Sequence, residues 1–156
     1  MGVFDFIKAA GERLGIGGAP ATSESKEVTP PPTAEQVQAL VAKLNLAVDD
    51  IQVKLNGDTV EVSGTAASNE AREKAILAAG NIAGVARVSE SITTPDGEAA
   101  STFYTVVKGD TLWKIAESHY GKGKGGKYTV IFEANKPMLK DPDKIYPGQN
   151  LRIPAL

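Results

Sequence analysis

The chain has no cysteine and a single histidine, His119, among its 156 residues. Without cysteine it has no disulfide framework, no thiol nucleophile and no thiolate metal ligand. Residues 141–143 (Asp-Pro-Asp) lack the ligand run and the glycine of a calcium loop. No motif offers a nucleophile, a base and an oxyanion site together. We therefore expect that the protein is not an enzyme.

Long apolar runs are also missing. Asp5, Lys8, Glu12 and Arg13 interrupt the apolar residues of the N-terminus, whereas a secretory signal needs roughly 7–15 apolar residues in a row. No stretch approaches the length of a transmembrane helix, about 20 residues. We expect no export signal, no transmembrane segment, a cytoplasmic location and a monomeric state.

The net charge of −2 is unevenly distributed. From Phe103 onward, nine Lys and Arg stand against five Asp and Glu, a net charge of +4. The residues before Phe103 carry eight against fourteen, a net charge of −6. The asymmetry is either ordinary surface variation or a source of attraction between the two halves or toward separate partners.

The N-terminus has an apolar pattern of its own. Val3, Phe4, Ile7 and Leu14 share one helical face. We expect residues 1–15 to form an amphipathic helix that docks on the first domain, with a membrane-surface helix as the alternative. Residues 16–32 are rich in Gly, Pro, Ser and Thr and predict a flexible linker.

Residues 33–94 predict a domain of order helix, strand, strand, helix, strand. Thr33 and Gln36 form a capping box that begins the first helix. Asn56-Gly57 is typical of a tight hairpin between two alternating strands. Ser68 caps a second helix, which is expected to end near Gly80.

Residues 95–102 are a second linker, and residues 103–156 predict a domain of order strand, helix, helix, strand. The β-branched and aromatic run at residues 103–107 indicates the first strand. Asp110 is expected to cap the helix that follows. Both domains mix helices with short strands, so the predicted fold class is α+β.

The second domain resembles the LysM family. The shared words are residues 104–106 (YTV), 108–113 (KGDTLW), 115–116 (IA), 120–121 (YG), 134–135 (AN), 145–149 (IYPGQ) and 153–154 (IP). The usual ligand of this family is an N-acetylglucosamine polymer such as peptidoglycan or chitin. The resemblance implies a glycan groove formed by Gly109, Asp110, Thr111, Ile145 and Tyr146.

The first domain resembles the BON family, through residues 60–64 (VEVSG), the alanine-rich helix and residues 82–88 (IAGVARV). A BON domain followed by a LysM domain resembles the small bacterial potassium-binding proteins. That resemblance implies K+ as the ligand and a sensor or buffer role in osmotic adaptation. The alternatives are an envelope module that binds glycan through LysM, and a phospholipid-surface binder, which the acidic charge of the first half disfavours.

The resemblance makes residues 80–85 the best candidate for the ion site. The last turn of a helix offers unpaired carbonyls and the negative end of the dipole, and two glycines allow an unusual backbone path. The predicted ligands are backbone carbonyls, which can bind a monovalent ion whatever the side chain. We assign them to Ile7, Ala10, Gly80, Ile82 and Val85.

Residues 121–127 (GKGKGGK) nearly match a phosphate-binding loop, but Tyr128 stands where that loop needs Ser or Thr. A helix precedes the glycines in place of a strand. We therefore interpret the segment as a flexible basic connector. We expect no nucleic-acid partner, because no aromatic residue alternates with these lysines. Trp113 is expected to be partly buried, in the core or as a ligand platform.

Overall fold

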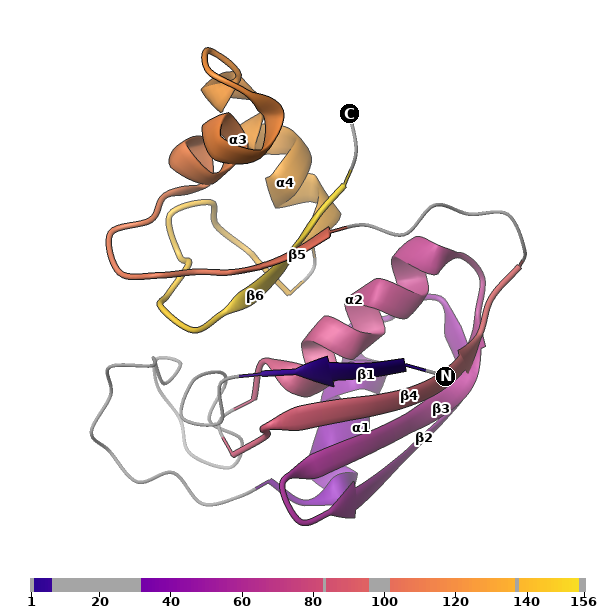
Figure 1. The fold of residues 1–156 in the computed structure, drawn as a ribbon. Helices are drawn as coiled ribbons and strands as arrows, with labels where there is room; N and C mark the ends of the chain where they lie inside the picture. The colour runs from indigo at the N-terminus through magenta and orange to yellow at the C-terminus, as the bar shows by residue number, and fades with distance from the viewer. Residues whose placement is uncertain (1, 7–31, 83, 96–101, 137, 155–156) are drawn as a thin grey trace.

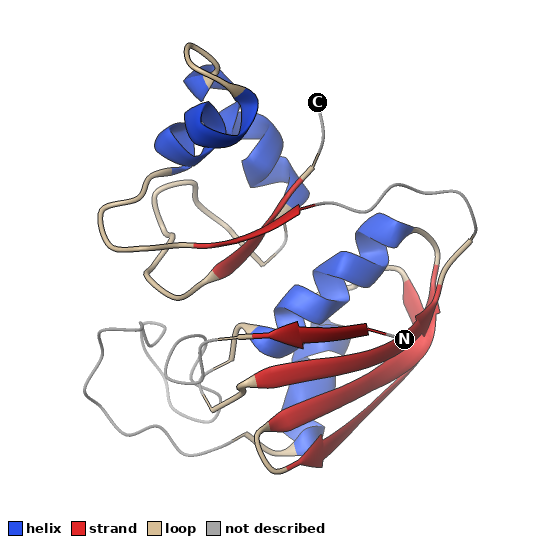
Figure 2. Ribbon diagram, in the orientation of Figure 1, coloured by secondary structure: helices blue, strands red, loops and turns tan. Residues whose placement is uncertain are grey.

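The computed structural model describes residues 2–6, 32–82, 84–95, 102–136 and 138–154, and the structural statements below concern these residues. They form an N-terminal and a C-terminal domain, each containing helices and a sheet (Figures 1 and 2). The predicted α+β class is confirmed.

The N-terminal domain is a four-stranded sheet with two helices on one face (Figure 1). Its strands and helices are β1 (Gly2–Asp5), α1 (Ala34–Lys43), β2 (Val48–Asn56), β3 (Thr59–Ala66), α2 (Asn69–Gly80) and β4 (Arg87–Thr93). The strand order is β1-β4-β3-β2; β3 and β4 are parallel, and the other pairs are antiparallel. From α1 onward, the order α-β-β-α-β agrees with the sequence prediction.

Local signals in the sequence set the boundaries of these elements. The Thr33 hydroxyl accepts from the Gln36 N–H, and the Gln36 side chain accepts from the Thr33 N–H, which completes the capping box. Ser68 caps α2 by accepting from the Ala71 N–H. Gly57 has φ +65° at the first loop position of the β2–β3 hairpin. This is the conformation that favours glycine in a two-residue turn.

The predicted N-terminal helix is wrong for Gly2–Asp5, which form β1 and pair with β4 from Gly2↔Glu90 to Asp5↔Arg87. Val3 is exposed while Phe4 is half-buried and Phe6 buried, which is the two-residue period of a strand. The edge of β4 offers backbone partners that the sequence pattern alone does not reveal. Residues 7–15 of the expected helix and 16–31 of the expected linker lie outside the described residues.

The C-terminal domain packs two helices and a short 3-10 turn on a two-stranded antiparallel sheet. It consists of β5 (Thr102–Thr105), α3 (Leu112–Tyr120), η1 (Gly125–Lys127), α4 (Tyr128–Ala134) and β6 (Asn150–Ile153). The predicted order β-α-α-β is confirmed. The helix cap differs from the prediction: Thr111 caps α3 by accepting from the Lys114 N–H. Asp110 instead accepts from the Val107 N–H and the Tyr104 hydroxyl.

Helix α2 lies between the two domains. The sheet of its own domain covers one side, and β6 of the other domain approaches the opposite side (Figure 1). Most residues of α2 are therefore buried, including Asn69 and Glu73. The second half of the helix is rich in alanine, and its charged residues, Glu70, Arg72, Glu73 and Lys74, lie in the first half. No helix within the described residues is both long and apolar enough to cross a membrane.

Candidate functional site

The C-terminal end of α2 carries carbonyl groups that the helix does not use. The last helical hydrogen bond joins the Asn81 N–H to the Leu77 carbonyl over 2.9 Å. Among the described residues, no backbone N–H donates to the carbonyls of Ala78, Ala79 or Gly80. These oxygens also lie at the negative end of the helix dipole. Both features favour a cation.

Gly80 allows the N-terminal strand to approach this helix end. A Cβ on Gly80 would lie 2.1 Å from Cζ of Phe6 and 2.3 Å from both Cε atoms, so the ring covers the glycine face-on. The Phe6 N–H also donates to the Ala86 carbonyl over 2.9 Å. The chain therefore reaches position 6 directly beside the loop that follows α2.

The chain leaves α2 at Gly80 and enters β4 at Arg87. Gly84 has φ +102°, a value that favours glycine, and the Val85 N–H donates to the Ile82 carbonyl over 3.1 Å. The side chains of Ile82 and Val85 are fully buried in the core, so only their backbone atoms can serve a ligand. Within the described part of the chain, no group of three His, Cys, Asp or Glu could hold a metal ion. Backbone carbonyls are another class of donor that can hold a monovalent ion.

Of the predicted ligand residues, Gly80 ends α2, and Ile82 and Val85 follow it in the connection to β4. Ile7 and Ala10 lie outside the described residues, one and four positions beyond Phe6. The assignment of individual carbonyls stays a prediction.

Asn150 connects this loop with the C-terminal domain. Its backbone N–H donates to Oδ1 of Asn81 over 2.9 Å, and its carbonyl accepts from Nδ2 of Asn81 over 2.8 Å. Its side-chain Nδ2 donates to the Asp5 carbonyl at 3.1 Å, and its Oδ1 accepts from the Thr105 hydroxyl. One residue of β6 therefore contacts the end of β1 and the residue that follows α2.

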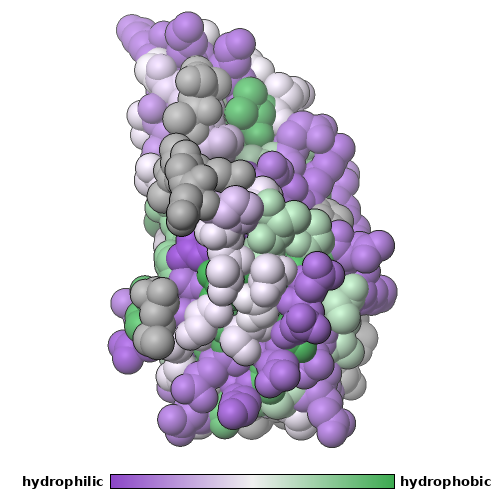
Figure 3. All heavy atoms as spheres, turned by 90° about the vertical axis from the view of Figure 1, so that its right-hand side faces the viewer, coloured by the Kyte–Doolittle hydropathy of each residue, from purple (hydrophilic) through white to green (hydrophobic). Residues whose placement is uncertain are grey.

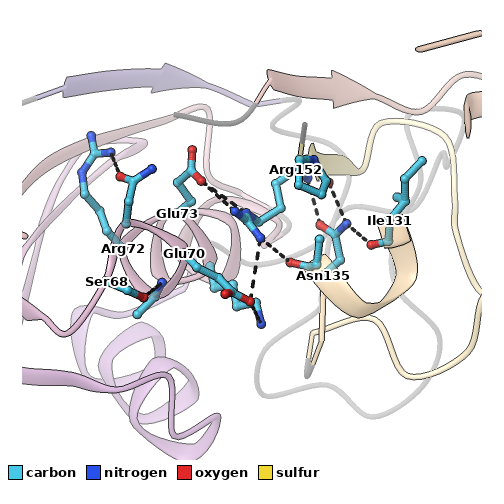
Figure 4. Close-up of polar contacts among 12 residues, drawn as sticks. Ser68, Glu70, Arg72, Glu73, Ile131, Asn135 and Arg152 are labelled. Carbon is cyan, nitrogen blue, oxygen red and sulfur yellow. Dashed lines mark hydrogen bonds and ion pairs between the residues drawn. The ribbon is translucent and has the colours of Figure 1, made fainter. Parts of the chain in front are cut away.

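Arg152 makes a second polar contact between the domains (Figure 4). Its guanidinium donates to Oε1 of Glu73 from Nη2 at 3.0 Å and from Nε at 3.3 Å, and Nη1 lies 3.9 Å from Glu70. Its backbone bonds reciprocally to the Asn135 side chain. Glu73 and Arg152 are both buried, at 2% and 6% exposed. A buried charge is stable only when it is paired and hydrogen-bonded, and the contact between Arg152 and Glu73 meets both conditions.

Sequence reasoning missed this interface. Glu73 and Leu77 of α2 and Asn81, the residue after the helix, face the C-terminal domain; they recur every four positions and so share one helical face. On β6, Asn150 and Arg152 alternate with core residues Leu151 and Ile153. The available signal was a buried alanine-rich helix that carries one acidic and one amide side chain at this spacing.

Two carboxylates near this helix are held in the charged form. Burial acts to raise the pKa of Glu90, but hydrogen bonds from Arg72 and from the Ile92 N–H outweigh it and lower that pKa. The hydrogen bond from Lys74 lowers the pKa of Glu70, with Arg152 adding a smaller attraction. Both carboxylates therefore contribute stability at neutral pH.

The residues of the implied glycan groove lie on two neighbouring loops. Hydrogen bonds of 2.8 Å, from Val106 to Gln149 and from Gly148 to Val106, hold the loops together. The groove residues range from exposed to half-buried: Gly109, Asp110, Thr111, Ile145 and Tyr146. The hydrogen bond to Asp110 raises the pKa of Tyr104 to about 12, with burial adding to it. Asp110 is thus already engaged within its own domain.

Comparison with known proteins agrees with this architecture. A model of the BON domain matches residues 32–96, and a model of the LysM domain matches residues 104–154. The chain is 43% identical over 155 residues, 99% of both chains, to the Escherichia coli O6:H1 protein named Potassium binding protein Kbp. It is 34% identical over 121 residues to an uncharacterized Deinococcus radiodurans protein, covering 70% of this chain and 46% of that one.

A shorter similarity involves an enzyme. The chain is 39% identical over 57 residues to a chlorophenol reductase of Desulfitobacterium hafniense, which covers 36% of this chain and 16% of the reductase. So small a share of the reductase carries no inference about its reaction. The matches to both domain models and along nearly the whole length of Kbp support a binding protein without enzymatic activity. The chain belongs to the family of Kbp, in which a BON domain precedes a LysM domain.

Proposed function

We propose that this protein binds potassium reversibly. The observation that carries the proposal is the 43% identity, over 99% of both chains, with a protein named for potassium binding. Because the identity spans both domains and the N-terminus, it supports a shared ligand better than a match to one domain would.

The end of α2 supports a site for this ion. A monovalent cation can be held by a ring of backbone carbonyls, and the carbonyls of residues 78–80 have no backbone partner among the described residues. The ligands would be the carbonyls of Gly80, Ile82 and Val85, completed by Ile7 and Ala10 from the N-terminal segment. Phe6 against Gly80 brings the chain to this loop one residue before Ile7.

The same loop offers a route from the ion to the LysM domain. Asn81 lies between the proposed ligands Gly80 and Ile82, and its side chain holds the backbone of Asn150 in β6. If a bound ion orders the loop, it would therefore favour the arrangement in which β6 packs against α2. This coupling suits a cytoplasmic potassium sensor or buffer in osmotic adaptation.

Calorimetric titration with KCl, and with NaCl in a parallel experiment, tests the proposal. Gly80→Ala places a methyl group where the Phe6 ring lies, so we expect potassium affinity to fall by at least about tenfold. Gly126→Ala is the matched control, because its added Cβ meets nothing within 4 Å. Absence of a potassium signal in the unmodified protein, or equal binding of sodium, contradicts the proposal.

Glycan binding through the LysM domain is a second candidate, supported by the family match over residues 104–154. Gly109 and Thr111 are exposed, and the contacts to the BON domain come from other residues, among them Asn150 and Arg152. A pull-down with purified peptidoglycan, comparing the unmodified protein with Thr111→Ala and Tyr146→Ala, tests it. Retention that both variants abolish would favour the glycan module.

A further inference from the structure

Trp113, the only tryptophan of the chain, has one face of its indole against the protein. A Cβ on Gly125 would lie 2.1 Å from the indole Cε2, 2.4 Å from Cδ2 and 2.5 Å from Cζ2. The first two atoms form the bond shared by the two rings, so Gly125 meets the flat of the indole. The side chain nevertheless remains 49% exposed. The ring is thus seated on the backbone with much of its surface open to solvent.

Four lysines lie next to this ring in the sequence and in the fold, and Nζ of one of them, Lys114, donates to the Gly109 carbonyl at 3.4 Å. Lys122, Lys124 and Lys127 are exposed in the segment that contains Gly125, and exposed Lys114 follows Trp113. None of these four lysines forms an ion pair with a described residue. Figure 3 shows hydrophilic side chains gathered at the end of the molecule where Figure 1 places α3.

The lysine segment is folded against α3. The Lys124 N–H donates to the Gly121 carbonyl at 3.0 Å, and the Lys127 N–H donates to the Lys124 carbonyl at 2.9 Å. Glu117 is the acidic residue that reaches the segment, and its Oε1 accepts from the Gly123 N–H at 3.3 Å. Residues 118–132 contain three lysines and no acidic residue. The lysines are therefore presented by hydrogen-bonded turns, in contrast to the flexible connector that the sequence suggested.

We infer that the Trp113–lysine surface, formed by Trp113, Lys114, Lys122, Lys124 and Lys127, binds single-stranded nucleic acid. An aromatic platform for base stacking beside cations for the phosphates is the combination used in sequence-independent binding of single strands. From the sequence alone we expected no nucleic-acid partner, because no aromatic residue alternates with the lysines. The fold supplies the aromatic residue from α3.

The geometry favours this ligand over two others. A neutral N-acetylglucosamine polymer can stack on an indole, but it has no charge that the lysines would attract. A lipid surface is anchored by aromatic rings that enter the interface, whereas this indole lies flat against Gly125. Stacked bases joined by phosphates use both features of the surface.

Binding is expected to be weak and strongly dependent on salt. Three phosphate contacts on single-stranded nucleic acid give a slope of about −2 in log K against log salt. Affinity should therefore fall roughly a hundredfold for each tenfold increase in NaCl. This surface belongs to the LysM domain and does not include the proposed ion site, so KCl is kept constant throughout.

The chain has one tryptophan and four tyrosines, so fluorescence excited selectively at the tryptophan reports on this surface. We expect an oligothymidylate of about eight nucleotides to quench the fluorescence of the full-length protein at low NaCl. The quenching should disappear as NaCl is raised, and a chitin oligomer or vesicles of phosphatidylcholine and phosphatidylglycerol should produce little change.

Three sets of variants separate the contributions of the lysine charges, of the indole ring and of the contact between the ring and Gly125. The fluorescence anisotropy of a fluorescein-labelled oligonucleotide measures the affinity of each variant. Replacing Lys122, Lys124 and Lys127 together by Gln should remove most of the salt slope, with only the share of Lys114 left. The exchange concerns exposed side chains and leaves the core unaltered. Trp113→Ala should weaken binding by roughly 5- to 150-fold, the loss of one stacked base. Gly125→Ala should weaken it by unseating the ring, whereas Gly126→Ala, in open space, should not.

The inference is overturned if the oligonucleotide produces no quenching at low salt, or if the triple lysine variant binds as well as the unmodified protein. Stronger quenching by the chitin oligomer or by the vesicles than by the oligonucleotide would also overturn it. Circular dichroism shows whether each variant is folded. If Trp113→Ala or Gly125→Ala fails to fold, the affinity of the triple lysine variant decides whether the inference holds.

Discussion

Glu90 is a charged residue in the row of side chains that β4 turns toward the helices. It lies between Val88 and Ile92 in that row and is 1% exposed. Arg72 of α2 donates to its Oε2 at 3.2 Å, and the Ile92 N–H donates to the same oxygen at 2.9 Å. A carboxylate in this position is stable only while these donors remain.

Glu90→Gln should therefore lower the free energy of unfolding by about 1.5–3 kcal/mol at pH 7, the range for hydrogen bonds to a charged group. The folded-state pKa of Glu90 lies below the ordinary value of 4.5 for a glutamate. The stabilisation is thus complete above pH 4.5 and is lost as the pH falls through the lower folded value. Urea unfolding from pH 7 to pH 3 measures it.

The two proteins should differ most at neutral pH and converge in acid. A difference in unfolding free energy that stays constant from pH 7 to pH 3 would show that the Glu90 charge plays no part in stability.

At the scale of elements, β1 is the strand that the sequence did not predict. Residues 1–14 fit a helical face, and a short apolar segment at a chain end has no local signal that favours pairing with a strand 85 residues away. The caps at Thr33 and Ser68 and the hairpin glycine Gly57 were predictable because each depends on residues within a few positions. The lone strand β1 depends on the free edge of β4.

In the candidate site, too, features set by nearby residues were predictable and contacts between distant residues were not. Gly80 and Gly84 were recognisable as backbone features at a helix end, and Gly84 indeed has positive φ. That Gly80 accommodates the Phe6 ring was not recognisable, since it requires knowing that β1 passes there. The Arg152–Glu73 pair likewise joins residues 79 positions apart.

Phe6→Ala tests the role of β1. Removing a buried phenylalanine ring costs about 3–5 kcal/mol in a core, so we expect a loss in unfolding free energy toward the lower end of that range at a chain terminus. Potassium affinity should fall with it, because the ring holds the N-terminal segment on Gly80. Urea unfolding and calorimetry measure the two effects.

Val3→Ala is the matched control, because Val3 lies in the same strand and is 61% exposed. It should change the unfolding free energy by no more than about 0.5 kcal/mol. Unchanged potassium affinity in Phe6→Ala would exclude the N-terminal segment from the site.

At the scale of the whole molecule, α2 is the element that both domains share. Glu73 of α2 and Arg152 of β6 are buried against each other, with Nη2 of Arg152 3.0 Å from Oε1 of Glu73. Breaking such a pair costs about 3–5 kcal/mol, whereas replacing both partners by apolar residues is often neutral.

Arg152→Leu should therefore separate the domains, because Glu73 regains water when β6 leaves α2. Glu73→Leu/Arg152→Leu should restore the docked arrangement. Small-angle scattering measures the separation, and hydrogen exchange of the α2 amides measures their exposure. If the double variant is as open as Arg152→Leu, the pair is not what holds the domains together.

Thermal unfolding in KCl and in NaCl at equal ionic strength tests the central claim most directly. Potassium that binds only the folded protein stabilises it by about 2.7 kcal/mol at a hundredfold excess over Kd, which raises the Tm of a chain of this size by roughly 5–10 °C. General screening acts alike in both salts. We predict a higher Tm in KCl that Gly80→Ala removes and Gly126→Ala retains. Equal Tm values of the unmodified protein in the two salts would contradict the account.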